Sequence, residues 1–275
     1  MLNILVAYPY MKKDVVDVLF ENRDSIRFLL DSGAFTAWKS GKPIELDDYC
    51  RFIENLPFKP WRYFNLDVIG DGDASFKNYE IMLKRGFSPI PIFTRGEDIE
   101  VLEEYYKTSD VVGIGGLVKT KGSKGFVKGV MRRAGDRKIH WLGFTARDML
   151  AYYRPYMCDC SSWNGAMKYG RLSLYDMNGR WLDMTKRNFA KKPSREVFRI
   201  LDDYGMPPER LSQRSQWKSS GKGIYALEVA SAKSWARFHI DISQKLGIKF
   251  FLACAGGGQV RMLFDAYNYW IKWRK

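Results

Sequence analysis

The sequence has few of the residues that usually hold metal ions or form disulfides. Four cysteines, at positions 50, 158, 160 and 254, and two histidines, His140 and His239, occur in 275 residues. No two cysteines have the Cys-x-x-Cys spacing of zinc ribbons and redox motifs. We therefore expect no disulfide framework, no zinc site, no bound cofactor and a reducing compartment.

Long hydrophobic runs are also missing. No stretch approaches the roughly 20 apolar residues of a membrane span. The apolar run at positions 1–7 is too short for a signal peptide and has no basic residues before it. We expect a cytoplasmic protein without a membrane partner.

Positive charge, by contrast, is abundant. Lysine and arginine number 45 against 31 aspartate and glutamate residues, which gives a formal charge of +14, and 15% of the residues are aromatic. A basic, aromatic-rich chain favours a polyanionic partner, nucleic acid first.

Short apolar runs alternate with amphipathic segments along the chain. The expected strands are Asn3–Ala7, Arg27–Leu30, Arg62–Asp67, Ser88–Phe93, Val111–Ile114, Lys138–Leu142, Tyr156–Asp159 and Lys249–Cys254. The expected helices are Lys12–Glu21, Leu46–Ile53, Ser75–Arg85, Asp98–Tyr106 and Val260–Trp273. Strands that alternate with helices indicate a parallel sheet. Eight strands predict an α/β fold, a (β/α)8 TIM barrel, as one catalytic domain over residues 1–275.

One segment, residues 164–235, breaks this alternation. It is rich in lysine, arginine, serine, glycine and tryptophan, as in the stretches 186–192 and 214–222. We expect a basic insertion in the barrel, with short structure of its own and a role in nucleic-acid docking.

Acids and glycines follow several of the expected strands. Asp31, Asp67 and Asp159 each end one run, and Gly115 and Gly116 end another. In barrel enzymes the chemistry lies at the carboxyl ends of the strands, so these residues are candidates for one site. For Asp31 a second interpretation stays open, a turn in which its carboxylate caps Gly33 or Ala34. Asp71 and Asp73 are expected to be turn and N-cap residues.

Other motifs give weaker indications of function. Cys158 and Cys160 share one face of a strand, with Asp159 on the other, and we expect them to be packing residues. The run 111–117 lacks the third glycine of a dinucleotide fingerprint. Gly256, Gly257 and Gly258 open a helix and, with Arg261 nearby, could bind phosphate, or could simply connect two elements. His140 is expected to be a hydrogen-bonded core residue.

Taken in order, these stretches resemble the tRNA-guanine transglycosylase superfamily, and more closely its short phage relatives that place 7-deazaguanines in DNA. The matching stretches are Leu30-Asp31-Ser32-Gly33-Ala34-Phe35-Thr36-Ala37-Trp38, Asn65-Leu66-Asp67-Val68-Ile69, Pro91-Ile92-Phe93-Thr94-Arg95-Gly96-Glu97, Gly113-Ile114-Gly115-Gly116-Leu117, His140-Trp141-Leu142-Gly143 and Cys158-Asp159-Cys160-Ser161-Ser162-Trp163.

The resemblance implies a (β/α)8 barrel and a pentosyltransferase that exchanges guanine for another base. It implies that Asp159 is the nucleophile at C1′ and that Asp31 acts in acid/base chemistry and contacts the base. Asp67 would bind the purine edge and the Gly115–Gly116 backbone its carbonyl. Ser32 and Phe35, in the same motif as Asp31, are further expected base-binding residues.

The family's cellular members carry a zinc subdomain with a Cys-x-Cys-x-x-Cys motif, which this sequence lacks. That departure favours DNA as the polynucleotide, with a free 7-deazaguanine such as preQ0 as second substrate and, for a phage protein, the host cytoplasm as its location. Two alternatives remain: a tRNA-guanine transglycosylase, and a nucleic-acid-binding barrel without catalysis. Any protein partner is unknown.

Overall fold

A computed structural model describes residues 1–117, 122–185, 194–212 and 226–273. Its contacts divide the chain into two compact units. The first unit comprises Met1–Cys160 and Leu246–Gly258, and the second comprises Ser161–Lys245 and Gln259–Lys275. Each unit is described by itself.

The first unit is built on a curled sheet of eight parallel strands. The strands are β1 (Leu2–Ala7), β2 (Ile26–Asp31), β3 (Arg62–Tyr63), β4 (Ile92–Phe93), β5 (Val111–Ile114), β6 (Lys138–Trp141), β7 (Met157–Cys160) and β10 (Lys249–Cys254). Their order in the sheet is β3-β2-β1-β10-β7-β6-β5-β4. All eight predicted strands are present. The neighbours follow chain order, as in a (β/α)8 fold, and β10 lies between β7 and β1.

The two edge strands, β3 and β4, are not joined by a continuous ladder. A single parallel bridge connects Phe64 to Ile90. Beside it, the buried Asn65 accepts a hydrogen bond from the Ile92 amide (3.0 Å) and donates one to the Ser75 carbonyl (3.2 Å). The Asn65 side chain thus satisfies the Ile92 amide, which the short ladder leaves without a partner, and connects this edge to the Ser75 carbonyl.

The inner face of the curled sheet is apolar near the amino ends of the strands. Its core cluster comprises Leu5, Leu29, Phe64, Ile90, Ile92, Val111, Met157 and Phe251. Glycine is required within this layer, because a Cβ on Gly113 would lie 2.8 Å from a methyl carbon of Leu142 and 3.1 Å from the Phe64 ring. The interior is therefore packed with side chains at this level.

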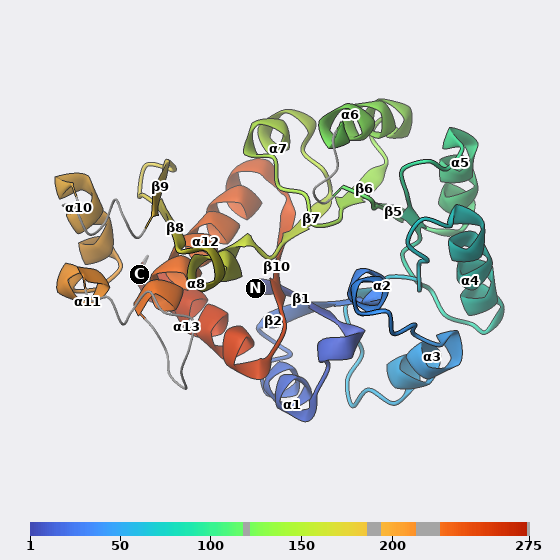
Figure 1. The fold of residues 1–275 in the computed structure, drawn as a ribbon, viewed down its shortest axis with the longest axis horizontal. Helices are drawn as coiled ribbons and strands as arrows, with labels where there is room; N and C mark the ends of the chain where they lie inside the picture. Colours follow the sequence, from blue (N-terminus) through green and yellow to red (C-terminus); the bar gives the residue numbers. More distant parts are fainter. Residues whose placement is uncertain (118–121, 186–193, 213–225, 274–275) are drawn as a thin grey trace. The chain divides into compact units, whose positions relative to one another are not determined.

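Helices follow most strands of the first unit. They are α1 (Lys13–Glu21), α2 (Ala34–Ser40), α3 (Leu46–Glu54), α4 (Gly72–Lys84), α5 (Ile99–Thr108), α6 (Ser123–Ala134) and α7 (Arg147–Tyr153), with the 3-10 helix η1 (Tyr8–Tyr10) after β1. Figure 1 shows α1 and α3 to α7 as an arc around the strands, with α2 inside that arc. Asp71 caps α4 by accepting a hydrogen bond from the Ala74 amide, as predicted.

Replacement of Asn65 by alanine tests the seam between β3 and β4. Because Asn65 is fully buried, the variant leaves the Ile92 amide without its partner, at about 1–3 kcal/mol. We expect the free energy of unfolding to fall by about 1–3 kcal/mol in urea titrations. The exposed Asn55→Ala is the control, and equal stability of both variants would contradict a structural role for Asn65.

The second unit contains a hairpin and several helices. Its elements are η2 (Ser162–Asn164), α8 (Gly165–Tyr169), β8 (Arg171–Tyr175), β9 (Trp181–Thr185), α10 (Arg195–Asp203), α11 (Pro208–Ser212), α12 (Ala226–Leu246, of which Leu246 belongs to the first unit) and α13 (Gly257–Trp273, from Gln259 onward). Strands β8 and β9 are antiparallel. Aromatic rings of Tyr175, Trp181, Trp235 and Phe238 pack together in its core.

The segment 164–235, where the sequence predicted an insertion, belongs to the second unit, and its described residues include β8, β9, α10 and α11. Its two most basic stretches, 186–192 and 214–222, lie outside the described residues. Across the described ranges, no helix has the length and apolarity needed to cross a membrane.

Candidate active site

Asp31 and Asp159 lie on the inner face of the sheet. Asp31 follows the core residue Leu29 by two positions on β2, and Asp159 follows the core residue Met157 by two on β7. Because side chains alternate along a strand, each carboxylate shares the face of its core neighbour, one step nearer the carboxyl end. The sheet therefore changes from apolar to acidic along its axis.

Two donors hold the Asp159 carboxylate by a single oxygen. His140 Nε2 lies 2.9 Å from Oδ1, and the Gly143 amide donates to the same Oδ1 at 2.9 Å. Asp159 is 8% exposed. This arrangement fixes the carboxylate plane and leaves Oδ2 as the oxygen outside these two bonds.

His140 is completely buried and hydrogen-bonded, in agreement with the expected core residue, and its partner is the candidate site residue Asp159. Asp159 Oδ1 already accepts a hydrogen bond from the Gly143 amide, and an imidazole tautomer with the proton on Nε2 makes His140 its second donor. Among described residues the buried Nδ1 has no hydrogen-bond partner, which is tolerable for a lone pair beside the Phe64 ring, 5.0 Å away between centroids. The sequence shows only an isolated histidine in a strand, so the pairing with Asp159 required the fold.

Asp67 comes next to Ser32 although 35 residues separate them in sequence. Ser32 Oγ donates to Asp67 Oδ1 at 2.9 Å, and the Ala34 amide donates to the same hydroxyl oxygen at 3.3 Å. Ser32 is fully buried and Asp67 is 8% exposed. The serine thus links the loop after β3 to the turn after β2.

Asp67 and Asp159 lie close enough to Asp31 for their charges to raise its pKa. Burial, then the charges of Asp67 and Asp159, raise the pKa of Asp31 to about 7. Although part of the Asp31 side chain is exposed, protein atoms surround the carboxylate closely. Burial likewise raises the pKa of Asp67 to about 6, against the opposing hydrogen bond from Ser32. Near neutral pH the site can therefore hold a protonated and an ionised carboxyl group side by side.

Asp31 makes the turn that the alternative interpretation predicted. Its Oδ2 accepts a hydrogen bond from the Gly33 amide at 3.1 Å, which is the predicted turn. Gly33 has φ +82°, and a Cβ there would lie 2.3 Å from Cδ of Pro9. The turn requires glycine, and it holds Asp31 in the acidic cluster.

The remaining predicted base-binding residues follow β5 and β2. The Gly115 amide already donates to the Phe93 carbonyl at 2.9 Å. Gly116, with φ +69°, donates no hydrogen bond to another described residue. Phe35 follows the Asp31 turn at the start of α2 and is 50% exposed. Within the described part of the chain, the Gly115 amide is therefore occupied, and the Gly116 amide is not.

The glycines that the sequence suggested for phosphate binding lie next to a carboxylate of the protein itself. The Gly257 amide, at the start of α13, donates to Asp14 Oδ2 at 2.9 Å, and a Cβ on Gly257 would lie 2.5 Å from the Asp14 carbonyl oxygen. A carboxylate thus already binds this helix N-terminus. Gly256 and Gly258 have open space around them, and Arg261 is exposed one turn further along the helix.

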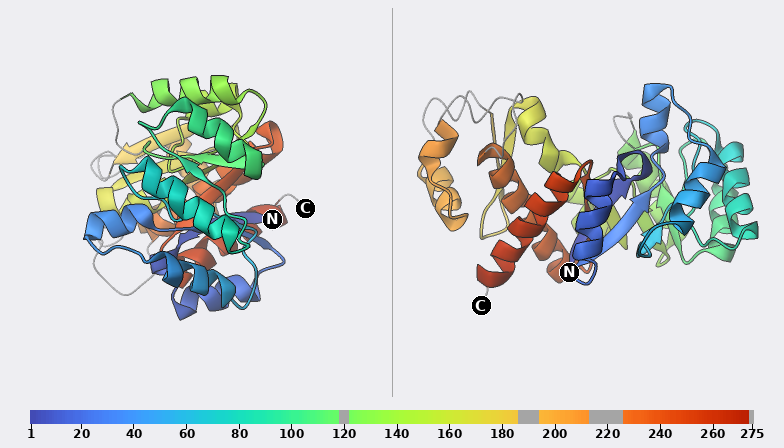
Figure 2. Two further views of the ribbon diagram at one scale, coloured as in Figure 1. Left: turned by 90° about the vertical axis from the view of Figure 1, so that its right-hand side faces the viewer. Right: turned by 90° about the horizontal axis from the view of Figure 1, so that it is seen from below.

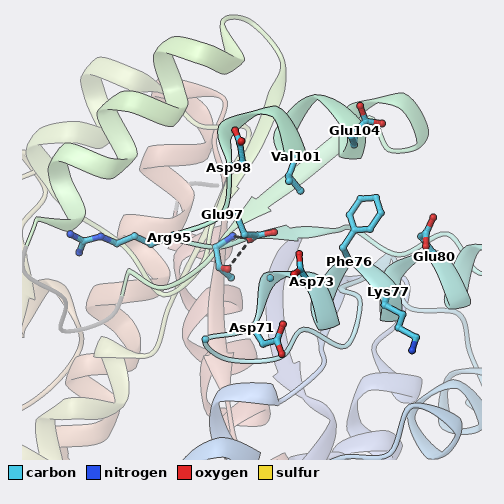
Figure 3. A pocket seen from close by; sticks show the side chains of 14 residues that line it. Asp71, Asp73, Phe76, Lys77, Glu80, Arg95, Glu97, Asp98, Val101 and Glu104 are labelled. Atoms are coloured by element: carbon cyan, nitrogen blue, oxygen red, sulfur yellow. Dashed lines mark hydrogen bonds between the residues drawn. The ribbon is translucent and has the colours of Figure 1, made fainter.

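A cavity of about 770 Å³ lies beside the loops after β3 and β4, and Figure 3 shows its acidic lining. Its lining residues are Gly70, Asp71, Gly72, Asp73, Phe76, Lys77, Glu80, Thr94, Arg95, Gly96, Glu97, Asp98, Val101 and Glu104. It includes none of the three clustered aspartates. Asp31, Asp67 and Asp159 form the stronger candidate site, because burial and mutual charge perturb the pKa of Asp31 there.

The cysteines beside Asp159 are packing residues. Cys158 and Cys160 are buried, and burial raises the pKa of the Cys158 thiol. Within the described ranges, no group of three or more histidine, cysteine, aspartate or glutamate side chains is placed to hold a metal ion.

Comparison with models of known protein families gives no match to this chain. A comparison with curated proteins also gives none. The clustered carboxylates, the His140–Asp159 pair and the Gly116 amide are therefore the observations on which a function can be argued.

Proposed function

We propose that this chain is a glycosyltransferase that replaces guanine in DNA by a 7-deazaguanine of the preQ0 type, through a covalent bond between Asp159 and C1′. The observation that carries the proposal is the cluster of Asp31, Asp67 and Asp159. One of its carboxylates is held by two donors, and another has a pKa near neutrality.

The chemistry assigns a different task to each acid. Asp159 Oδ2 attacks C1′ while the C1′–N9 bond breaks, and protonated Asp31 supplies the proton that the departing guanine needs. Asp31, now ionised, takes the N9 proton of the incoming base. That base then attacks C1′ and releases Asp159. Two displacements give net retention at C1′, as in retaining glycosidases.

Asp67 and Gly116 would read the purine. A guanine edge offers adjacent N–H donors that suit a carboxylate acceptor, and its carbonyl suits an amide donor. Ser32 holds Asp67 in place through the 2.9 Å hydrogen bond. We further propose that the curled sheet works as a (β/α)8 barrel, because the Phe64–Ile90 bridge connects its edge strands.

The carboxylates also count against a binding protein without catalysis. A pKa raised by burial means that ionised Asp31 and Asp67 reduce the stability of the fold. Carboxylates also repel the phosphates of a polyanion. A module that only binds nucleic acid has no use for such a cluster, whereas base exchange uses each of the three acids.

DNA is the proposed polynucleotide. The charge of +14 suits a phosphate backbone, and the sequence lacks the zinc motif of the tRNA-modifying family members. A base in a duplex must leave the stack before C1′ can be attacked. A tRNA remains the alternative polynucleotide.

The experiment supplies the wild-type protein with labelled guanine or preQ0 and with either duplex DNA or tRNA. Label in DNA alone supports the proposal. Label in tRNA alone would replace DNA by tRNA as the substrate, and no label in either polynucleotide would overturn base exchange.

His140 provides a prediction about positioning. His140→Phe removes the donor to Asp159 while keeping a planar ring, and we expect kcat to fall about 100-fold with little change in KM, because the nucleophile loses its orientation. His140→Gln retains an N–H donor and should recover most of kcat. Steady-state kinetics on both variants checks this; equal losses with equally lowered melting temperatures would reduce His140 to a packing residue.

A further inference from the structure

Helix α2 carries two large aromatic side chains in water. Trp38 is 63% exposed and Phe35 is 50% exposed, and their rings touch, with centroids 5.9 Å apart. In both views of Figure 2, α2 projects from the rest of the first unit. Contiguous exposed aromatic surface is unusual on a soluble domain and marks an interaction site.

Two lysines accompany these rings. Lys39 on α2 and Lys42 just after it are both exposed, and the segment 32–44 between Asp31 and Glu45 contains no acid. Aromatic rings combined with lysines match a nucleic-acid strand, which offers flat bases and anionic phosphates. A protein partner with an apolar groove would satisfy the rings but would not need the lysines.

Helix α2 is also tied to the candidate active site. It begins three residues after Asp31, across the tight turn at Gly33, and the Ala34 amide donates to Ser32 Oγ, which itself donates to Asp67. A nucleotide whose base reaches Asp31 and Asp67 therefore has its chain neighbours within reach of α2.

We propose that α2 is the element that contacts DNA beside the extruded guanine. When the guanine leaves the stack, Trp38 stacks on the neighbouring base pair that is exposed. The inference rests on the proposed function for the identity of the extruded base. Extrusion costs base stacking, and an aromatic ring that covers the exposed neighbour replaces part of it. Lys39 and Lys42 bind the flanking phosphates.

The test uses two DNA duplexes, one with the target guanine paired and one with it opposite an abasic position, where less stacking and pairing is lost. Trp38→Ala should lower kcat/KM on the paired duplex about 10- to 100-fold, the size of one lost base–aromatic contact, and by less than about threefold on the other. Trp38→Phe should restore most activity on the paired duplex. Tyr152→Ala removes another exposed aromatic side chain, 79% exposed on α7, and should change neither rate.

Binding of the same duplexes, followed by fluorescence anisotropy, separates this proposal from base exchange. If the wild type exchanges no base but Trp38→Ala still weakens binding of the paired duplex selectively, the exchange proposal is overturned. The proposal that α2 contacts DNA is then still supported. If wild type exchanges guanine and Trp38→Ala affects both duplexes equally or neither, the stacking role is overturned. Weaker binding of tRNA with unchanged binding of DNA would overturn DNA as the occupant.

Discussion

Asp159→Asn is expected to lower the rate of base exchange by about 10⁴-fold or more, the scale of losing a covalent nucleophile. Asparagine keeps an oxygen that can accept the hydrogen bonds from His140 and Gly143, so the fold and the DNA affinity should be preserved. The loss would therefore report chemistry. Exchange of labelled preQ0 into DNA measures the rate, and anisotropy measures DNA affinity.

A covalent intermediate makes the same prediction visible without kinetics. Wild-type protein mixed with DNA in the absence of free base should gain the mass of a DNA strand under denaturing conditions, and Asp159→Asn should not. Asp73→Asn, at an exposed acid of the cavity near α4, is the matched control and should behave as wild type. Normal exchange by the Asp159 variant would remove Asp159 as nucleophile.

Asp31→Asn is expected to lower kcat/KM by about 10²- to 10⁴-fold, since it removes the general acid. For the wild type, the pKa of about 7 at Asp31 predicts that kcat/KM for DNA falls about tenfold per pH unit above neutrality, as the proton is lost. Because Asp67 and Asp31 interact, the apparent pKa belongs to the pair. A rate that stays constant from pH 6 to 9 would exclude Asp31 as the acid.

The same pKa shift predicts a pH dependence of stability that needs no substrate. The folded pKa of Asp31 lies above its unfolded value of 3.8, so its contribution to stability is full below pH 4 and is lost as pH rises through about 7. Asp31→Asn removes this loss. Its melting temperature, relative to wild type, should rise by about 2–4 °C between pH 5 and pH 8.

Asp110→Asn is the control with opposite sign. The hydrogen bond from Arg62 holds the pKa of the Asp110 carboxyl at about 2, so this group adds stability above pH 4 and loses it on acidification. Asp110→Asn should therefore gain nothing at pH 8. A pH-independent difference between Asp31→Asn and wild type would contradict the burial of the Asp31 carboxylate.

The eight strands could be predicted because buried parallel strands are short apolar runs, and such runs are visible without knowledge of their partners. The residues at which the strands end were harder to predict. The sequence predicted Arg62–Asp67 and Ser88–Phe93, whereas β3 and β4 contain two residues each. Asn65 interrupts the ladder there by bonding with its side chain, and no periodic pattern reveals that exchange.

The candidate site, like the sheet, could be predicted in part from the sequence. The positions of Asp31 and Asp159 at strand ends were visible in the sequence, because an acid that ends an apolar run is conspicuous. The contact of Ser32 with Asp67 and that of His140 with Asp159 join residues 35 and 19 positions apart. Such pairs depend on which strands become neighbours, which local sequence does not specify.

The position of β10 has a consequence for when the protein can become active during synthesis. In the sheet, β10 separates β1 from β7 and pairs with both, yet it is the last of the eight strands to leave the ribosome. Until residues 249–254 arrive, the strands that carry Asp31 and Asp159 have no connection through this side of the sheet. The pairing of Ile4 with Leu252 spans nearly the whole chain, and contacts of such long range form slowly. Assembly of the acidic cluster is therefore a late event in folding, and a nascent chain that lacks β10 has not yet formed the candidate site.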